Sequence, residues 1–315
     1  MNAETPAASV LPDARPASLV LRLTPPAALP FVQLARLDRP IGWQLLLAPC
    51  WQSAALAGLA ARSGPSLAHL ALFLIGAIAM RGAGSTYNDI LDRGLDAGVE
   101  RTRGRPLPSG RVGLRAAAIF LVAQSLVGLA VLLCFNAFSI ALGMGSLAIV
   151  AIYPLMKRVT AWPQAVLGLA FAYGALMGWA ARYGALAWPA VFLYASAICW
   201  TIGYDTIYAL QDARDDAIVG IKSTARLFGD KARLGISAFY ALAATFAQLA
   251  LFTAGAGLVA EVGFAAWCAH LYWQLGQVEG ATPAVALKLF RSNRNAGLIL
   301  FAGIAAEGWA RQVLG

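Results

Sequence analysis

Charged side chains are scarce in this chain of 315 residues: Asp, Glu, Lys and Arg together make up 12% of it, against 60% hydrophobic residues. A soluble domain carries about a quarter charged residues, so the composition argues against a soluble fold and predicts an integral membrane protein. The net charge of +9 does not indicate nucleic-acid binding, because the basic residues cluster between apolar segments and form no basic face with interleaved aromatic residues.

Histidine and cysteine are also rare. Two histidines, His69 and His270, argue against a histidine-based metal site or catalytic base. The four cysteines lie scattered in apolar segments with no paired spacing. Such cysteines are typical of small hydrophobic core residues, so neither a disulfide framework nor a cysteine metal site is expected.

Long apolar runs fill most of the chain. A membrane-crossing helix needs about 20 apolar residues, and the sequence predicts an all-α integral membrane protein with a bundle of nine such helices. They are expected near residues 41–61, 66–88, 115–134, 137–156, 164–182, 187–208, 233–254, 257–276 and 295–312. Residues 1–30, rich in Ala and Pro, are expected to form a disordered or surface-lying tail, and residues 31–315 a single transmembrane domain.

Positive charge follows every second predicted helix. Basic residues cluster in the loops near residues 93–111, 157–158, 214–231 and 288–294, whereas the alternate loops carry only Arg62 and Arg182. Because basic loops stay in the cytoplasm, the sequence predicts that the even-numbered loops and the N-terminus are cytoplasmic. No Arg- and Ser-rich presequence is seen, which favours a bacterial inner membrane over a mitochondrial one.

Two aspartate-bearing stretches, residues 87–96 and 204–216, each follow a predicted membrane helix and open on this cytoplasmic face. In the first stretch Asn88, Asp92 and Asp96 are spaced by four residues, which places them on one face of a helix. In the second, Asp205, Asp212 and Asp216 are spaced by seven and four, with Tyr208 beside them.

Carboxylates four residues apart repel one another on a bare helix, and a divalent cation would relieve that repulsion. Mg²⁺ prefers oxygen ligands, takes one or two carboxylates, and completes its shell with water and substrate phosphates. The alternative is that these acids form salt bridges with neighbouring arginines. For a single aspartate the salt bridge is the better interpretation, but two matched sets on one membrane face favour a site for Mg²⁺ and a diphosphate.

The basic loops supply matching cations. Residues 101–110 combine arginines with Pro and Gly, which is typical of an ordered loop, and an arginine fork binds phosphate or carboxylate. Lys157 and Arg158 follow Tyr153 and Pro154, and Lys222 lies in an Ile-Lys-Ser-Thr run. The alternative is that these residues only orient the protein in the membrane; this alternative is preferred for Arg111, Arg115, Lys231 and Arg233.

These motifs together resemble the UbiA family of membrane prenyltransferases, over about residues 36–310. The resemblance is carried by Asn88-Asp89-x-x-Asp92-Arg93-x-x-Asp96, by Arg101-Thr102-x-x-Arg105-Pro106-Leu107-Pro108-Ser109-Gly110, by Tyr153-Pro154-x-x-Lys157-Arg158, by Tyr204-Asp205-Thr206-x-Tyr208-Ala209 through Asp216, by Gly220 to Gly229, by Arg39-Pro40-Ile41-Gly42 and by Leu289-Phe290-x-Ser292-Asn293. Ala213-Arg214 departs from the family pattern, in which Arg directly follows the Asp, and this leaves the contribution of Arg214 open.

The resemblance implies a central cavity capped on the cytoplasmic side by the two aspartate stretches. Mg²⁺ held there would bind the diphosphate of a polyprenyl donor. The implied metal ligands are Asn88, Asp92, Asp212 and Asp216, with Asp96 and Asp205 in support. The implied diphosphate-binding groups are Lys157, Arg158, Arg101 and Arg105, with Lys222 as a further donor. Tyr204 and Tyr208 would stabilise an allylic cation through their ring faces, or would serve as interfacial anchors.

Within the family, the second motif and the Ile-Lys-Ser-Thr run are most similar to the members that prenylate 4-hydroxybenzoate in ubiquinone synthesis. The implied reaction joins the polyprenyl chain to the ring carbon ortho to the hydroxyl, and Arg39 or Arg81 would bind the acceptor carboxylate. Other acceptors (a naphthoate, homogentisate, a haem or a chlorophyllide) are the main alternative. A cation-coupled transporter would instead have its acids near the bilayer midplane, and a purely structural protein leaves both aspartate sets unexplained.

Overall fold

The computed structural model describes residues 19–98, 102–211 and 222–314, and all regular structure in these residues is helical. The prediction of an all-α protein is therefore confirmed for the described part of the chain. The chain forms two compact units, one comprising Met1–Trp43 and Ile75–Ala130 and the other Gln44–Leu74 and Val131–Gly315.

The first unit contains α1 (Leu19–Leu23), α2 (Leu29–Leu34), most of α4 (Leu67–Ala97) and most of α5 (Leu114–Leu132). Its small core consists of Leu34, Val112 and Ala117. Phe31, Ile90, Leu107 and Phe120 pack against this core, so that side chains from α2, α4, α5 and the loop between α4 and α5 meet in one cluster. Hydrophobic packing thus holds the basic loop onto the helices of its own unit.

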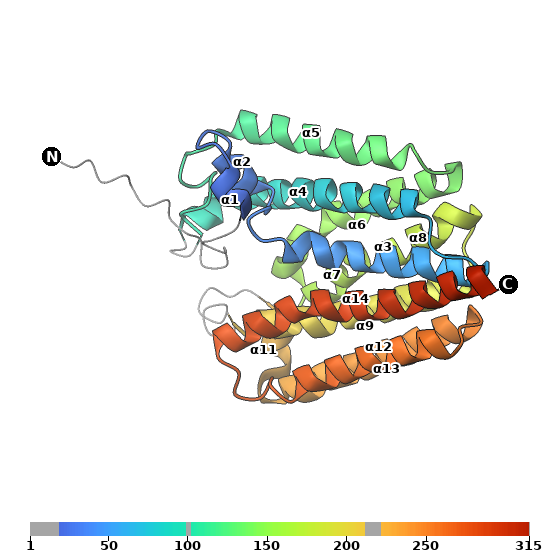
Figure 1. The fold of residues 1–315 in the computed structure, drawn as a ribbon. Coiled ribbons are helices and arrows are strands. Elements are labelled where there is room, and N and C mark those ends of the chain that lie inside the picture. The colour runs from blue at the N-terminus through green and yellow to red at the C-terminus, as the bar shows by residue number, and fades with distance from the viewer. Residues whose placement is uncertain (1–18, 99–101, 212–221, 315) are drawn as a thin grey trace. The chain divides into compact units, whose positions relative to one another are not determined.

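The second unit contains most of α3 and the helices from α6 onward (Figure 1). They are α3 (Ile41–Ala60), α6 (Ala137–Val159), α7 (Pro163–Phe171), α8 (Gly174–Tyr183), α9 (Trp188–Ala209), α11 (Thr224–Phe228), the 3-10 helix η1 (Gly229–Lys231), α12 (Ala232–Thr253), α13 (Leu258–Leu275) and α14 (Pro283–Leu314). Helix α9 packs along α12 and α7, and α13 packs along α14. Helices α13 and α14 approach closely because glycines face each other: a Cβ added at Gly263 would lie 2.6 Å from the Cα of Gly303.

Six of the described segments are long and apolar enough to cross a membrane. They are Leu67–Gly94, Leu114–Leu132, Ala137–Met156, Pro163–Tyr183, Trp188–Ala209 and Thr224–Thr253. The remaining predicted spans coincide with α3, α13 and α14, which are less apolar. Helix α3 carries two glutamines and an internal proline, α13 carries Glu261, His270 and Gln274, and α14 carries charged residues at both ends.

Two helices differ in shape from the sequence prediction. The fifth predicted span consists of two helices, α7 and α8, which meet at Ala172 and Tyr173. Gly174 follows this break, and a Cβ there would lie 2.4 Å from the Sγ of Cys50. Helix α4 extends past the predicted membrane span of residues 66–88, through Gly94 to Ala97, so that Asp96 lies on the helix as its four-residue spacing predicts.

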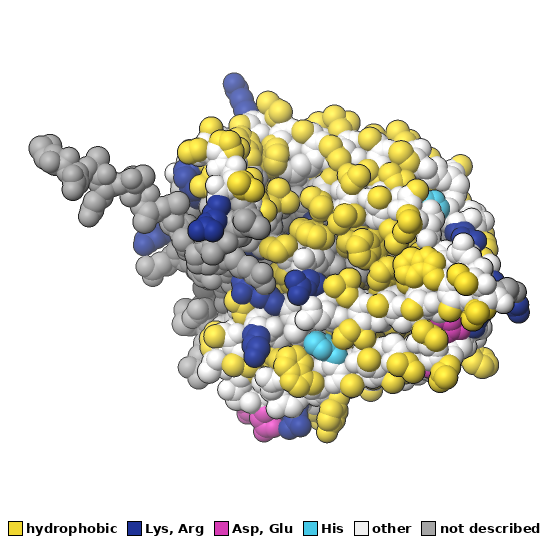
Figure 2. Space-filling model, in the orientation of Figure 1, with side chains coloured by type: hydrophobic (Ala, Val, Ile, Leu, Met, Phe, Trp, Pro, Cys, Tyr) yellow, Lys and Arg dark blue, Asp and Glu magenta, His cyan; other side chains and the backbone are white. Residues whose placement is uncertain are grey.

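The outward helix faces are apolar. On α5 the side chains of Leu114, Ile119, Val122 and Leu126 are exposed, and on α13 those of Leu258, Val262 and Tyr272. Figure 2 shows hydrophobic side chains spread over the surfaces of α5 and of the α12–α13 pair. Extended exposed apolar surface on helices of membrane-crossing length is what lipid contact requires. The protein is an integral membrane protein.

Candidate functional site

The first acidic motif lies near the C-terminal end of α4. Because the helix is continuous from Leu67 to Ala97, the four-residue spacing keeps Asn88, Asp92 and Asp96 on one face as predicted. Asp92 is 2% exposed and Asp96 8%, while Asn88 is half-buried. Buried carboxylates are energetically unfavourable unless cations or hydrogen-bond donors accompany them.

Arginines compensate for the buried charge of Asp96 and of Asp89, the residue that follows Asn88. The Nη1 of Arg105 donates to Oδ2 of Asp96 at 2.7 Å and lies 3.4 Å from Oδ1 of Asp89. The Nη2 of Arg36 donates to the same Oδ1 at 2.6 Å. Thr102 Oγ1 donates to the backbone oxygen of Asp96 at 2.9 Å, which adds a second contact between the loop and α4.

A second ion pair lies beside this one. Asp38 is fully buried, and the Nε of Arg39 donates to its Oδ2 at 3.3 Å. Burial raises the pKa of the Asp38 carboxyl above its usual value, although Arg39 and Arg36 oppose that rise. Burial lowers the pKa of Arg36 to about 10, with Asp89 opposing the decrease and the charges of Arg105, Arg39 and Arg81 adding to it.

Three further guanidinium groups of the first unit, those of Arg39, Arg81 and Arg105, thus lie within electrostatic range of Arg36. The side chain of Arg81 passes Gly42, where an added Cβ would lie 2.4 Å from Nε. Arg39, Arg81 and Arg105 were predicted to bind substrate; Arg36 was not, and neither was Asp89. The sequence signals for them were that Asp89 belongs to the first acidic motif and that Arg36 lies three residues before the Arg39-Pro40-Ile41-Gly42 motif.

The second acidic motif begins on α9. Tyr204 is 2% exposed, and Asp205 and Tyr208 are half-buried. The rings of Tyr204 and Tyr208 lie 5.9 Å and 4.6 Å from that of Phe290 on α14. These three rings form an aromatic cluster at the end of α9 from which the motif continues. The predicted ligands Asp212 and Asp216 lie outside the described residues.

A buried polar network anchors this aromatic cluster. Trp200 Nε1 donates to Oδ1 of Asn293 at 2.8 Å, and Asn293 Nδ2 donates to Oε1 of Gln274 at 3.3 Å. Tyr240 OH donates to the same Gln274 oxygen at 2.6 Å. Trp200, Gln274 and Tyr240 were not predicted from the sequence, although polar groups inside apolar helices are a usable signal.

The predicted phosphate-binding cations are described only in part. Lys157 and Arg158 lie on α6, but their side chains, like all of Arg101, are outside the described residues. Lys222 is exposed, and its Nζ lies 3.2 Å from the backbone oxygen of Val159. The side chain of Ser223 accepts a hydrogen bond from the backbone N–H of Arg226 and so caps the N-terminus of α11. The serine of the Ile-Lys-Ser-Thr run therefore has a structural role.

Within the described residues, no three or more His, Cys, Asp or Glu side chains are grouped so that they could hold a metal ion. The donors on α4 are nevertheless of the kind that Mg²⁺ prefers: an amide oxygen from Asn88 and carboxylate oxygens from Asp92 and Asp96, on a single helix face. The chemistry of these donors fits a hard divalent cation bound together with an anionic ligand.

Comparisons with known proteins agree with the motif resemblance. The model of the UbiA prenyltransferase family matches residues 46–297. The protein named "4-hydroxybenzoate polyprenyltransferase, mitochondrial" from Drosophila pseudoobscura pseudoobscura is 46% identical over 297 residues, which cover 94% of this chain and 75% of that protein. The protein of the same name from Homo sapiens is 44% identical over 294 residues, covering 91% of this chain and 78% of that one.

Solved structures give the same result. A UbiA homolog from Aeropyrum pernix K1 superimposes with a TM-score of 0.70 at 26% identity and covers 84% of this chain and 97% of that one. A UbiA homolog from Archaeoglobus fulgidus bound to GPP and Mg2+ has the same fold, with a TM-score of 0.63 at 20% identity over 90% of this chain and 99% of that one. The chain therefore belongs to the UbiA prenyltransferase family.

Proposed function

We propose that this protein transfers a polyprenyl chain from polyprenyl diphosphate to the ring carbon ortho to the hydroxyl of 4-hydroxybenzoate, releasing diphosphate, as a step of ubiquinone biosynthesis. The observation that carries the proposal is the identity of 44–48% to proteins named for this activity, which extends over most of the chain. The acidic motifs, the arginine loop and the aromatic cluster supply groups suited to each part of the reaction.

The proposed metal ligands are Asn88, Asp92, Asp212 and Asp216, with Asp96 and Asp205 in support. The oxygen donors that share one face of α4 support this assignment, and the homolog from A. fulgidus bound to GPP and Mg2+ supports Mg²⁺ as the ion. When bound, Mg²⁺ neutralises diphosphate oxygens and makes the diphosphate a better leaving group.

The proposed diphosphate-binding groups are Arg101, Arg105, Lys157, Arg158 and Lys222. Arg105 is the best described of them, and its guanidinium already binds a carboxylate oxygen at 2.7 Å. A guanidinium fork recognises carboxylate and phosphate with similar geometry. As the bond between the prenyl carbon and oxygen breaks, its electron pair leaves with the diphosphate, and these cations stabilise the charge that develops there.

The allylic cation formed in this step must be kept from water. The apolar helices exclude solvent, and the rings of Tyr204 and Tyr208, which pack near Phe290, are proposed to stabilise positive charge through their faces. The ring carbon of the acceptor attacks the cation, and the proton on that carbon then leaves to restore aromaticity. Arg39 or Arg81, each within electrostatic range of Arg36, is the candidate group for binding the acceptor carboxylate.

We further propose that residues 31–315 form one transmembrane domain of nine membrane-crossing helices around a central cavity, with residues 1–30 as a separate tail. The clustering of basic residues on alternate loops supports a cytoplasmic position for both acidic motifs, which would cap that cavity. The Drosophila and human relatives are mitochondrial proteins by name, which weakens the prediction of a bacterial inner membrane. The proposal is therefore limited to the orientation of the protein in its membrane.

The acceptor is tested by competition. Purified protein in nanodiscs is given polyprenyl diphosphate, Mg²⁺ and equal concentrations of 4-hydroxybenzoate, a dihydroxynaphthoate and homogentisate. The proposal predicts that prenylated 4-hydroxybenzoate is the main product by mass spectrometry. A main product from either other acceptor would retain the family chemistry but contradict the proposed substrate.

A further inference from the structure

Asp89 is a buried acid that the proposed chemistry does not use. It follows Asn88 directly on α4, about 100° further around the helix, and is 1% exposed. Among the described residues its Oδ1 accepts from Arg36 at 2.6 Å and from Arg105 at 3.4 Å, and its Oδ2 has no hydrogen-bond partner there. All three residues belong to the first unit.

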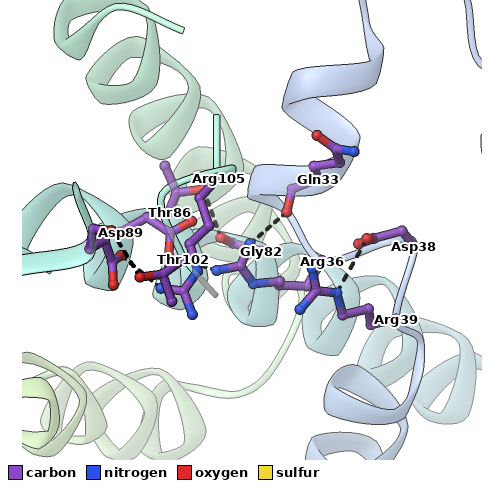
Figure 3. Close-up of polar contacts among 10 residues, drawn as sticks. Gln33, Arg36, Asp38, Arg39, Gly82, Thr86, Asp89, Thr102 and Arg105 are labelled. Atoms are coloured by element: carbon purple, nitrogen blue, oxygen red, sulfur yellow. Dashed lines mark hydrogen bonds and ion pairs between the residues drawn. The ribbon is translucent and has the colours of Figure 1, made fainter. Parts of the chain in front are cut away.

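The two arginines come from separate segments. Arg105 lies in the loop between α4 and α5, and Arg36 lies in the turn between α2 and α3 (Figure 3). Arg36 has a φ of 56°, in the left-handed region that residues other than glycine rarely adopt. Its Nη1 donates to the backbone oxygen of Gln33 at 2.9 Å, so its own turn fixes the guanidinium that meets Asp89.

The four charges alternate along one connected line. Arg36 contacts Asp89, Asp89 contacts Arg105, and Arg105 contacts Asp96. Without Asp89, the two partly buried guanidiniums would have one counter-ion fewer, and among the described residues Arg105 would keep only Asp96 as an ion-pair partner. In a low-dielectric environment, removing one partner of an ion pair is unfavourable mainly because the remaining charge is left uncompensated.

We propose that Asp89 is a positioning residue for diphosphate binding, which holds Arg105 at the acidic face of α4 so that its guanidinium is presented to the diphosphate. The inference rests on the proposed function, because it takes Arg105 to be a diphosphate-binding group. Asp89 touches neither substrate nor metal in this role. Its effect passes through Arg105, and the contact with Arg36 keeps the carboxylate in place.

The test measures binding of inorganic diphosphate, with Mg²⁺ present, to the full-length protein in nanodiscs by calorimetry. Asp89→Asn is expected to weaken binding about tenfold, because it removes one of two charged partners that orient Arg105. In an Arg105→Gln background the same substitution is expected to change the affinity by less than about twofold. Asp89→Glu, which keeps the charge, is expected to restore most of the affinity.

A merely structural role predicts a different pattern. Glu307→Gln removes another buried carboxylate, whose described partners are Arg311, Gly257 and Ala260, and serves as the matched control. It should lower the melting temperature while leaving diphosphate affinity unchanged. If Asp89→Asn weakens binding by the same factor with and without Arg105, or does not weaken it at all, the proposal is overturned. If Asp89→Asn fails to fold, Arg36→Gln takes its place and is measured in the same way, with and without Arg105→Gln. An equal loss of diphosphate affinity with and without Arg105 would then overturn the proposal.

The acceptor competition assay on the wild-type protein separates this inference from the proposed function. Wild-type protein that binds diphosphate but prenylates another acceptor would refute the proposed substrate. The binding measurements on the Asp89 and Arg105 variants would still test the role of Asp89. Wild-type protein that fails to bind diphosphate would overturn both.

Discussion

At Gly42 the absence of a side chain makes room for a candidate substrate-binding residue. A Cβ at this position would lie 2.4 Å from Nε and 3.1 Å from Cζ of Arg81. The neighbour is the end of a flexible side chain, so a methyl group here displaces the guanidinium and leaves the backbone in place. Gly42 belongs to the Arg-Pro-Ile-Gly motif, and the closeness of Arg81 explains why the motif has a glycine at this position.

Gly42→Ala is therefore expected to raise the KM for 4-hydroxybenzoate by about tenfold, because a charge-assisted contact to the acceptor carboxylate becomes misaligned. Steady-state kinetics with each substrate varied in turn measure this effect. Gly84→Ala is the matched control, since a Cβ there meets nothing within 4 Å. An unchanged KM in Gly42→Ala would argue against Arg81 as the acceptor-binding group.

Asp92 is the most buried of the three candidate ligands on α4, at 2% exposed. Asp92→Ala removes one carboxylate from the proposed metal set, and kcat/KM for prenyl transfer is expected to fall by about 100-fold or more. Mg²⁺ affinity, measured by calorimetry with diphosphate present, should fall in parallel. The exposed acid Asp230 provides the control substitution. Near-normal turnover in Asp92→Ala would remove Asp92 from the proposed ligand set.

At the scale of single elements, the termini of α13 and α14 depend on each other. Glu307 on α14 is 5% exposed and accepts from the backbone N–H groups of Gly257 at 2.6 Å and Ala260 at 2.8 Å. These are unsatisfied donors at the start of α13, so a side chain from the neighbouring helix acts as its cap. Arg311 forms an ion pair with the same carboxylate.

Glu307→Gln should lower the free energy of unfolding by about 1–3 kcal/mol, because a charged acceptor of buried donors becomes a weaker, neutral one. A thermal melt in detergent or nanodiscs measures the change. Glu279→Gln is the comparison: Glu279 pairs with Arg233 but its side chain is 76% exposed. An exposed pair of this kind contributes at most about 1 kcal/mol. Equal shifts in the two variants would mean that the cap contributes little.

At the scale of the whole molecule, composition and the length of the apolar runs predicted an all-α membrane protein, because bilayer thickness fixes the length of a membrane-crossing helix. The break between α7 and α8 was not predictable, since the apolar pattern of residues 164–182 continues through it. The break follows from tertiary packing, with Gly174 placed against Cys50 of α3. The polar residues of α3, α13 and α14 reduce their hydropathy below that of the six other spans.

The candidate site was predictable only where spacing along one helix fixes it. Asn88, Asp92 and Asp96 share a face because α4 is continuous. Their four-residue spacing along the sequence is sufficient to predict this shared face. The ion pair between Arg36 and Asp89 joins residues separated by 53 positions. It depends on the left-handed backbone of Arg36, which no local pattern predicted. The salt-bridge alternative, preferred for a single aspartate, describes Asp89 and Asp96, which both contact Arg105.

The activity inferred for this chain is metal-dependent prenyl transfer to 4-hydroxybenzoate. It is tested most directly by one assay on purified protein in nanodiscs, supplied with polyprenyl diphosphate and 4-hydroxybenzoate. The assay runs with Mg²⁺, then with a chelator, and then with Mg²⁺ restored. We expect 4-hydroxybenzoate prenylated ortho to the hydroxyl in the first and third conditions and no prenylated product in the second. Product formed at the same rate in the chelator, or no product in any condition, would contradict it.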